Sequence, residues 1–478
     1  MRAASGDRPR VVDLFSGAGG FSLGFHAAGC IIRAGVDLDR MAVKTFARNF
    51  TRLQPDCPPH TTVGDIERIP LGSLIGDERP DILIGGPPCQ GFSRVGRAKL
   101  DSLNGHGFEE DPRNALYRKF LDAAERWHPL LVVMENVPGM LSVRAENVAD
   151  AAARELAGLG YRVGYAVLNA VWFGVPQFRE RLFVVGVRND TGVLPLMPPA
   201  THRAILPPGY LRPEERLSLP LPFVRHYELP VQLDVAMLPT TTVAEALDDL
   251  PVLTAHLAAG DRPGRGDFRR PMPYRSAPHS AYARLMRAWP GLGVPDTVVD
   301  HVIRRTPRDY RIFREMAPGD RYPEALVIAR RLLDEEFARL QAAGHRPAPE
   351  TDAFRKLVEA FVPPYPEGIF IDKWRKLVSD QPSWTIPAHL SKDSYSHIHH
   401  DAGQARMISI REAARLQSFP DAFMFAGNMG ECFRQIGNAV PPMVARAIAD
   451  ALLPLLGAVR PFLPDSMAAR DLAVADRP

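Results

Sequence analysis

The first 190 residues alternate short apolar runs with helical stretches, and turns that contain glycine follow several of these runs. Residues 11–15 form the first run, Ser-Gly-Ala-Gly-Gly follows at 16–20, and a helix is predicted from Phe21. Further strands are predicted at 31–36, 82–85, 130–134, 161–168 and 182–187, and helices at 41–50 and 146–159. Alternating strands and helices are typical of a mostly parallel sheet. The sequence therefore predicts an α/β fold for this part of the chain.

The composition changes near residue 195. From there to about residue 370, prolines and arginines are frequent and only one clear helix is predicted, at 325–343. A proline-rich stretch, 195–222, is interpreted as a linker between two lobes. Residues 262–331 contain 15 Arg, no Lys and 7 acidic residues. Arginine suits bidentate recognition of phosphate and guanine, although a solvated surface explains such a charge run equally well. Helices are predicted again at 410–417 and 442–453.

The length and composition of the chain limit the classes of protein to which it can belong. The 478 residues suffice for at least two domains, and no run of about 18 apolar residues predicts a membrane span. Its four cysteines are scattered without a Cys-x-x-Cys pair, which favours neither a disulfide framework nor a zinc site and suggests a cytoplasmic protein. The histidines at 397, 399 and 400 are interpreted as phosphate contacts or plain surface rather than as metal ligands.

The turn at 16–20 carries the first candidate binding site. Glycines let the backbone approach a ligand closely, and the start of the following helix favours a negative group. An acid about 20 residues further on binds ribose hydroxyls in such folds, and Asp37 lies at that distance. Asp65, after the next expected strand, could accept a hydrogen bond from an adenine amino group. We therefore expect a cofactor of the adenosine type; without a P-loop lysine, phosphate transfer is disfavoured.

Two further strand ends carry reactive side chains. Gly-Gly-Pro-Pro at 85–88 stops a strand directly before Cys89, and Glu135 ends another strand. Neighbouring parallel strands direct their carboxyl ends into one crevice, so these residues are expected to meet. A thiolate beside a carboxyl group is a working catalytic pair; the structural alternatives are a buried apolar cysteine and an ion-paired strand end. Arg179 and Arg181 alternate on entry to a strand and would clamp a base edge or a phosphate, unless they are surface charges.

These segments resemble the DNA (cytosine-5)-methyltransferase family in its unpermuted bacterial and phage form. Six motifs follow one another in family order. They lie at 13–20, at 87–90 (Pro-Pro-Cys-Gln), at 135–137 (Glu-Asn-Val), at 177–181 (Gln-x-Arg-x-Arg), at 411–421 and at 435–442. Together they cover residues 11–190 and about 375–457, and the segment between about 195 and 395 takes the position of the family's variable target-recognition region.

The resemblance implies an α/β, Rossmann-like fold for an S-adenosylmethionine-dependent methyltransferase, with a mostly parallel sheet and a smaller, irregular target-recognition domain. The catalytic, cofactor-binding domain would comprise residues 1–190 and about 430–460, the DNA-binding domain about 191–425, and a peripheral tail 461–478. S-adenosyl-L-methionine would be the cofactor, S-adenosyl-L-homocysteine its product, and no metal is expected. The implied cofactor contacts are Asp13, Phe15, Ser16, Gly17, Gly19, Gly20, Asp37, Leu38, Asp65, Ile66, Pro87, Leu116, Asn438 and Val440.

The resemblance also implies the catalytic residues. Cys89, as thiolate, would add to C6 of an extruded cytosine so that C5 can accept the methyl group, because a stacked base cannot be attacked inside a duplex. Glu135 would hold N3 and the exocyclic amine, and Asn136 would brace the pocket. Arg181 would contact the O2 region, and Arg179 a backbone phosphate or the loop at 94–107 that closes on the base.

Double-stranded DNA is the implied partner. The chain would act as a monomer without a membrane, as the modification enzyme of a restriction system whose cognate endonuclease acts separately. The alternative is a tRNA cytosine-5 methyltransferase of the same fold, although its recognition region is typically short and roughly 200 residues separate the motif blocks here. A nucleotide-dependent oxidoreductase would leave Cys89 and Glu135 without a role, and a non-catalytic DNA-binding relative would not need them.

Overall fold

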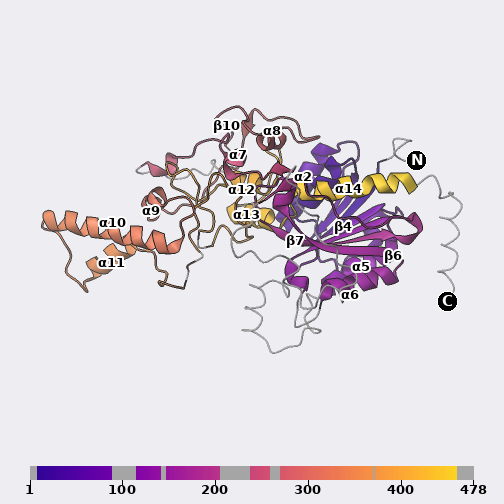
Figure 1. The fold of residues 1–478 in the computed structure, drawn as a ribbon, viewed down its shortest axis with the longest axis horizontal. Helices are drawn as coiled ribbons and strands as arrows, with labels where there is room; N and C mark the ends of the chain where they lie inside the picture. The colour runs from indigo at the N-terminus through magenta and orange to yellow at the C-terminus, as the bar shows by residue number, and fades with distance from the viewer. Residues whose placement is uncertain are drawn as a thin grey trace. The chain divides into compact units, whose positions relative to one another are not determined.

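The computed structural model describes residues 8–88, 115–141, 147–204, 237–258, 270–369, 371, 373–393 and 395–459 (Figure 1). The chain divides into two compact units. We call the first the sheet unit; it contains Met1–Gly174, Arg179–Pro239 and Ala439–Pro478. The second, the irregular unit, contains Val175–Phe178 and Thr240–Asn438.

A seven-stranded sheet is the centre of the sheet unit. Its strands are β1 (Arg10–Leu14), β2 (Ile31–Asp37), β3 (His60–Val63), β4 (Ile82–Gly85), β5 (Leu131–Asn136), β6 (Tyr161–Asn169) and β7 (Glu180–Arg188). Their spatial order is β3-β2-β1-β4-β5-β7-β6. Strands β1 to β5 pair in parallel, whereas β7 runs antiparallel to both β5 and β6. The predicted α/β fold with a mostly parallel sheet is confirmed.

Helices cover both faces of this sheet, which explains why its central strands are apolar throughout. Strand β4 and strand β5 are buried at every position. The helices are α1 (Gly20–Ala27), α2 (Arg40–Leu53), α3 (Gly72–Ile75), α5 (Ala115–Trp127), α6 (Val148–Gly158) and α14 (Pro442–Val459). Figure 1 shows α2 and α14 on one side of the sheet and α5 and α6 on the other.

Short elements complete the sheet unit. They are the 3₁₀ helices η3 (Pro138–Leu141), η4 (Ala170–Phe173) and η5 (Asn189–Thr191), and the paired strands β8 (His202–Arg203) and β9 (Leu238–Pro239). Most of the expected linker, residues 205–222, and the expected tail, 461–478, lie outside the described residues.

Helix α14 brings the last described part of the chain onto the first helix. At Gly24 of α1, a Cβ atom would lie 2.4 Å from the Cβ of Ala445, so the two helices approach closely where neither has a large side chain. Among the described residues one helical stretch, Met429–Leu456, is apolar and long enough to cross a membrane, but 56% of its most apolar window is buried inside the protein. The core helix of a globular protein has the same composition.

The irregular unit contains more helices than the sequence predicts. Its elements are α7 (Val243–Leu247), η8 (Ala255–Leu257), β10 (Met272–Pro273), α8 (Ala281–Arg287), β11 (Thr297–Val298), α9 (Tyr310–Glu315), α10 (Tyr322–Ala342), α11 (Asp352–Phe361), α12 (Ile410–Leu416) and α13 (Met429–Asn438). The expectation of a single helix between 195 and 370 is therefore wrong. Helix α10 is the predicted one, whereas α7, α8 and α9 have only 5, 7 and 6 residues, too few to display helical periodicity.

Buried arginines hold the irregular unit together around α12. Arg415 binds Asp421 and Asp249, with Nε–Oδ1 and Nη1–Oδ1 distances of 2.6 and 2.9 Å, and all three side chains are inaccessible. Arg406 likewise donates to Glu412 at 2.6 Å. Buried charges must be paired and hydrogen-bonded, and the Arg415–Asp249 pair joins segments that are 166 positions apart in the sequence.

His397 and His399 belong to this buried framework, so the surface and phosphate interpretations are wrong for these two, whereas His400 is partly exposed and binds Asp248 with Nε2–Oδ1 at 2.8 Å. His397 is fully buried and its Nε2 lies 3.1 Å from the Trp384 carbonyl oxygen, and His399 Nε2 lies 3.5 Å from Glu412. The apolar Ile398 between them pairs with two other segments, which draws its neighbours into the interior. No group of three or more potential metal ligands occurs in the part of the chain that the structure describes.

Candidate active site

The glycine-rich turn after β1 contains backbone conformations with positive φ, which glycine adopts easily and other residues adopt only with strain. Gly17 and Gly19 have φ values of 53° and 93°, and Phe15 between β1 and the turn has φ 62°, which a bulky residue rarely adopts. A Cβ atom at Gly19 would lie 2.6 Å from the Phe50 ring. The turn is closed by the amide of Gly17, which donates to Asp37 Oδ2 at 2.8 Å. The turn and the acid 20 residues later are thus one structural unit.

Asp13 lies buried beneath this turn. Its side chain is 1% exposed, and Oδ2 accepts a hydrogen bond from Ser22 Oγ at 2.6 Å. Burial raises the pKa of Asp13 from 3.8 to about 8; the nearby charge of Asp37 raises it further, and the hydrogen bond from Ser22 opposes the shift. Asp13 therefore carries a proton at neutral pH in the ligand-free protein.

The ends of β2 and β3 add further polar groups at the same edge of the sheet. Burial raises the pKa of Asp37, although the amides of Asp39 and Gly17 donate to its carboxylate. Leu38 is 74% exposed beside it. Asp65 follows β3, and Ile66 after it is buried. The glycine-rich turn, Asp37 and Asp65 therefore lie at or just after the ends of β1, β2 and β3, which are neighbours in the sheet.

The Gly-Gly-Pro-Pro turn after β4 is tied to the end of β5. Asn136 Nδ2 donates to the Pro87 carbonyl oxygen at 3.2 Å. A Cβ atom at Gly86 would lie 3.0 Å from Glu135 Oε2, so the carboxylate occupies the space that the glycine leaves open. Cys89 itself lies outside the described residues. The backbone two residues before it is nevertheless held beside Glu135 and Asn136.

Glu135 is buried against two arginines. Arg181 Nε lies 2.9 Å from Glu135 Oε1, and β5 and β7 pair through Glu135 and Phe183. Burial raises the pKa of Glu135, opposed by the positive charges of Arg181 and then Arg179. The net shift is upward, so Glu135 retains its proton to a higher pH than an exposed glutamate does.

Arg179 and Arg181 differ in their surroundings. Arg181 is partly exposed and donates to the Glu180 carbonyl oxygen at 2.6 Å. Arg179 is 1% exposed, and its Nη2 donates to the Ala439 carbonyl oxygen at 3.1 Å. A buried guanidinium cannot reach a DNA phosphate in this arrangement, so Arg179 is placed to hold the segment before α14.

The remaining predicted contacts are distributed over both units. Phe15 and Leu116 are partly buried and pack against the sheet core, and Ser16, Gly20 and Pro87 are buried. Val440 is buried in the sheet unit, whereas Asn438 ends α13 in the irregular unit with its side chain exposed. The loop expected at 94–107 lies outside the described residues.

Sequence reasoning missed two residues that shape this site. Ser22 binds Asp13, and Gly86 leaves room for Glu135. No signal marks Ser22, since a serine in the first turns of a helix has many roles. Gly86 stands in the quoted Gly-Gly-Pro-Pro turn, but only the paired strands reveal which side chain fills its empty side.

The turn after β1 also contains buried polar atoms without a partner among the described residues. They are Asp13 Oδ1 and Ser16 Oγ. Buried polar groups are almost always hydrogen-bonded, so the unpaired atoms of Asp13 at the end of β1 and of Ser16 in the turn are available to a polar ligand. A donor and an acceptor beside glycines with positive φ fit a cofactor that carries hydroxyl and amino groups.

Comparisons with known proteins agree with this geometry. The family model described as C-5 cytosine-specific DNA methylase matches residues 9–215 and 365–453. M.OihORF3336P of Oceanobacillus iheyensis, whose name assigns it provisionally to the type II methyltransferases, is 40% identical over 455 residues, which cover 93% of this chain and 95% of that protein. Type II methyltransferase M.AgeI of Thalassovita gelatinovora is 32% identical over 469 residues, covering 93% and 99%.

A solved structure shows the shared fold. It is titled provisionally as a DNA modification methyltransferase encoded in an E. coli prophage, and it superposes with a TM-score of 0.60 at 22% identity, covering 94% of this chain and 99% of that one. The matched motifs, the sheet and the extent of the alignments lead to one conclusion: this chain belongs to the family of C-5 cytosine-specific DNA methylases.

Proposed function

We propose that this family member methylates C5 of a cytosine in duplex DNA, with S-adenosyl-L-methionine as methyl donor and Cys89 as nucleophile. The observation that carries the proposal is the link between the β4 and β5 ends: Asn136 holds the Pro87 carbonyl, and Glu135 fills the space beside Gly86. This link holds Gly86 and Pro87, which precede Cys89 in the chain, beside a buried carboxyl group. A thiol and a carboxyl at one edge of a sheet are the pair that addition to a pyrimidine requires.

The turn after β1 would hold the methyl donor. Asp37 would accept from the ribose hydroxyls, and Asp65 from the adenine amino group, beside Leu38 and Ile66. The orphaned atoms of Asp13 and Ser16 would complete their hydrogen bonds to polar groups of the same molecule. When bound, S-adenosylmethionine supplies an electrophilic methyl group on a sulfonium sulfur.

The chain's own residues would prepare the cytosine. The Cys89 thiolate would add to C6, and the electron pair displaced by this bond would make C5 nucleophilic. Negative charge then develops at N3. The raised pKa of Glu135 would favour a protonated carboxyl that donates to N3, and its second oxygen would accept from the exocyclic amine. After methylation, loss of the C5 proton would expel Cys89.

The two arginines would have different roles. Arg181 would orient Glu135 through the Nε contact and present its remaining donors to the cytosine O2. Arg179 would act as a positioning residue, because its buried guanidinium holds Ala439 and its charge opposes the upward pKa shift of Glu135. Asn136 would fix the turn that carries Cys89.

The irregular unit would recognise the DNA sequence. Several arginines of the 262–331 segment are already paired within the unit: Arg287 binds Asp249 at 2.5 Å, and Arg331 pairs with Glu315 and Glu335. Exposed ones, such as Arg275 and Arg284, are better placed for phosphate or base contacts. We propose a monomeric modification enzyme that protects cytoplasmic DNA from a separate restriction endonuclease.

Covalent trapping tests this function directly. A duplex library containing 5-fluorocytosine, incubated with the protein and S-adenosylmethionine, should yield an adduct whose peptide map places the DNA on Cys89, because fluorine cannot leave C5 as a proton does. Cys89→Ala should abolish the adduct and methyl transfer but retain cofactor binding. Cys57→Ala is the matched control, since Cys57 is a partly exposed thiol in the same unit.

Two results would overturn the proposal. One is full methyl transfer by the Cys89→Ala protein; the other is an adduct on another residue. Labelled methyl transfer to tRNA but to no duplex would favour the tRNA alternative. Bisulfite sequencing of DNA from expressing cells would then identify the methylated site.

A further inference from the structure

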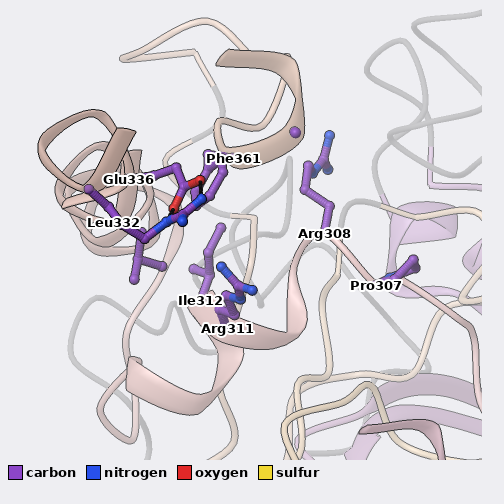
Figure 2. Close-up of a pocket in the computed structure, with 9 residues that line it drawn as sticks. Pro307, Arg308, Arg311, Ile312, Leu332, Glu336 and Phe361 are labelled. Atoms are coloured by element: carbon purple, nitrogen blue, oxygen red, sulfur yellow. Dashed lines mark hydrogen bonds and ion pairs between the residues drawn. The ribbon is translucent and has the colours of Figure 1, made fainter. Parts of the chain in front are cut away.

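A cavity of about 610 Å³ opens in the irregular unit between α9, α10 and α11 (Figure 2). Pockets of 300–1,000 Å³ commonly hold small molecules. The lining residues belong to 307–312, 332–339 and 360–361, which lie outside the two segments that the family model matches. The family's chemistry therefore does not account for this cavity.

Three guanidinium groups line the cavity, from Arg308, Arg311 and Arg339. One of them is neutralised locally, because Arg339 donates to both oxygens of Glu336 at 2.8 and 2.7 Å, and Glu336 is the acid among the lining residues. Arg308 binds Asp309, with Nε–Oδ1 at 2.6 Å. The local charge remains positive.

Arg311 carries the uncompensated charge. No carboxylate of a described residue forms an ion pair with it, and its guanidinium carbon lies 5.8 Å from the centre of the Phe361 ring. Its charge acts on Glu336 only at longer range, where it helps Arg339 to lower the pKa of that carboxyl group. The N–H donors of Arg311 are thus available to a ligand in the cavity.

The rest of the wall is apolar. Figure 2 shows Arg311 and Ile312 facing Leu332, Glu336 and Phe361, with Arg308 on the other side of the opening. Phe361 ends α11 and is only partly buried, as is Leu332, whereas Ile312 is 1% exposed and forms the floor beneath them. The accessible part of a flat aromatic ring and a leucine favour a planar apolar group, whereas the guanidiniums favour phosphate.

We propose that this cavity binds a nucleotide, with its phosphate on Arg311 and Arg308 and its base against Phe361 and Leu332. Glu336 would accept a hydrogen bond from an exocyclic amine. The concave shape selects a discrete nucleotide over the backbone of an intact duplex, which follows a convex path. The nucleotide can come from solution or from an unpaired stretch of DNA, and both present the same phosphate and base.

Isothermal titration of the full chain tests this site. Saturating S-adenosylhomocysteine is present throughout, so that nucleotides cannot report on the family's cofactor site. Adenosine monophosphate should bind with a Kd below about 1 mM. Adenosine and inorganic phosphate should each bind at least about tenfold more weakly, because each lacks one half of the recognised group.

Matched variants separate the contributions. Arg311→Ala should raise the Kd for the nucleotide about tenfold or more, since a charge-assisted hydrogen bond is lost. Phe361→Ala should weaken nucleotide binding and leave phosphate affinity unchanged. Arg314→Ala is the control, because Arg314 is exposed on the same helix but does not line the cavity. Thermal melting checks that each variant is folded.

Each possible outcome of these titrations supports or contradicts the proposal. Competition by a single-stranded 12-mer supports a DNA-derived nucleotide, and its absence with intact nucleotide binding supports a free one. Absence of saturable binding by the wild-type protein up to about 5 mM would overturn the proposal. So would an unchanged Kd in Arg311→Ala, or inorganic phosphate binding as tightly as the nucleotide.

Discussion

Replacement of Asp13 by Asn should change how the stability of the sheet unit depends on pH. Burial raises the pKa of Asp13 to about 8 from 3.8, so the folded state retains a proton that the unfolded state has lost at neutral pH. Raising the pH therefore favours unfolding of the wild-type protein. The contribution of the protonated acid is fully present below pH 3.8 and disappears as the pH approaches about 8.

The size of the effect follows from the shift. Each pKa unit corresponds to about 1.4 kcal/mol, so a shift of about four units amounts to about 6 kcal/mol in total. Between pH 5 and 7.5 the wild-type protein should lose about 3 kcal/mol relative to Asp13→Asn, whose neutral amide replaces the neutral acid without a titration. The two proteins should have similar stabilities only below about pH 3.8, where Asp13 is protonated in both the folded and the unfolded state.

Urea unfolding of the cofactor-free proteins at half-unit pH intervals measures this difference, with a probe that reports on the sheet unit. Ser22→Ala provides an internal test. The hydrogen bond from Ser22 lowers the pKa of Asp13, so its loss should raise that pKa and extend to higher pH the range over which stability falls. Parallel stability curves for the wild-type and Asp13→Asn proteins would refute the reasoning, because Asp13 would then titrate alike in both states.

Three further changes test other parts of the structure. Gly24→Ala should destabilise the sheet unit by about 1–3 kcal/mol in thermal melting, because its new Cβ would lie 2.4 Å from that of Ala445; an unchanged Tm would show that α1 and α14 can separate without cost. Arg415→Ala should cost the irregular unit about 3–5 kcal/mol in urea, since it leaves the buried Asp421 without its ion-pair partner and Asp249 with Arg287 alone, and a loss below 1 kcal/mol would contradict this. Glu135→Gln should slow single-turnover methyl transfer about 100-fold or more with cofactor affinity retained; a normal rate would remove Glu135 from catalysis.

The parts of the site that depend on residues close together in the sequence could be predicted. The turn at 16–20 requires glycine, and the sequence distance to Asp37 matches the length of one helix and one strand. The apolar runs before Cys89 and Glu135 predict buried strands. Parallel pairing then brings their carboxyl ends together, as the contact between Asn136 and Pro87 illustrates.

Environments that depend on residues far apart in the sequence could not be predicted in this way. Arg179 and Arg181 are equivalent in the sequence, yet one is buried against Ala439 and the other contacts Glu135. The segment 397–400 has the composition of a surface cluster, yet His397 and His399 are buried on either side of Ile398, which pairs with Lys376 and Met407. In both cases a residue more than about 10 positions away decides the environment, and periodicity carries no information about it.

By itself, the sequence determined the alternation of strands and helices, the family and the reactive groups at the strand ends, because periodicity and turn chemistry act over a few residues. Only the tertiary structure decided which charges are buried, which arginine faces Glu135, and that α9, α10 and α11 enclose a cationic cavity. Those properties depend on desolvation and on ion pairs between distant segments, and both arise only when the chain has folded.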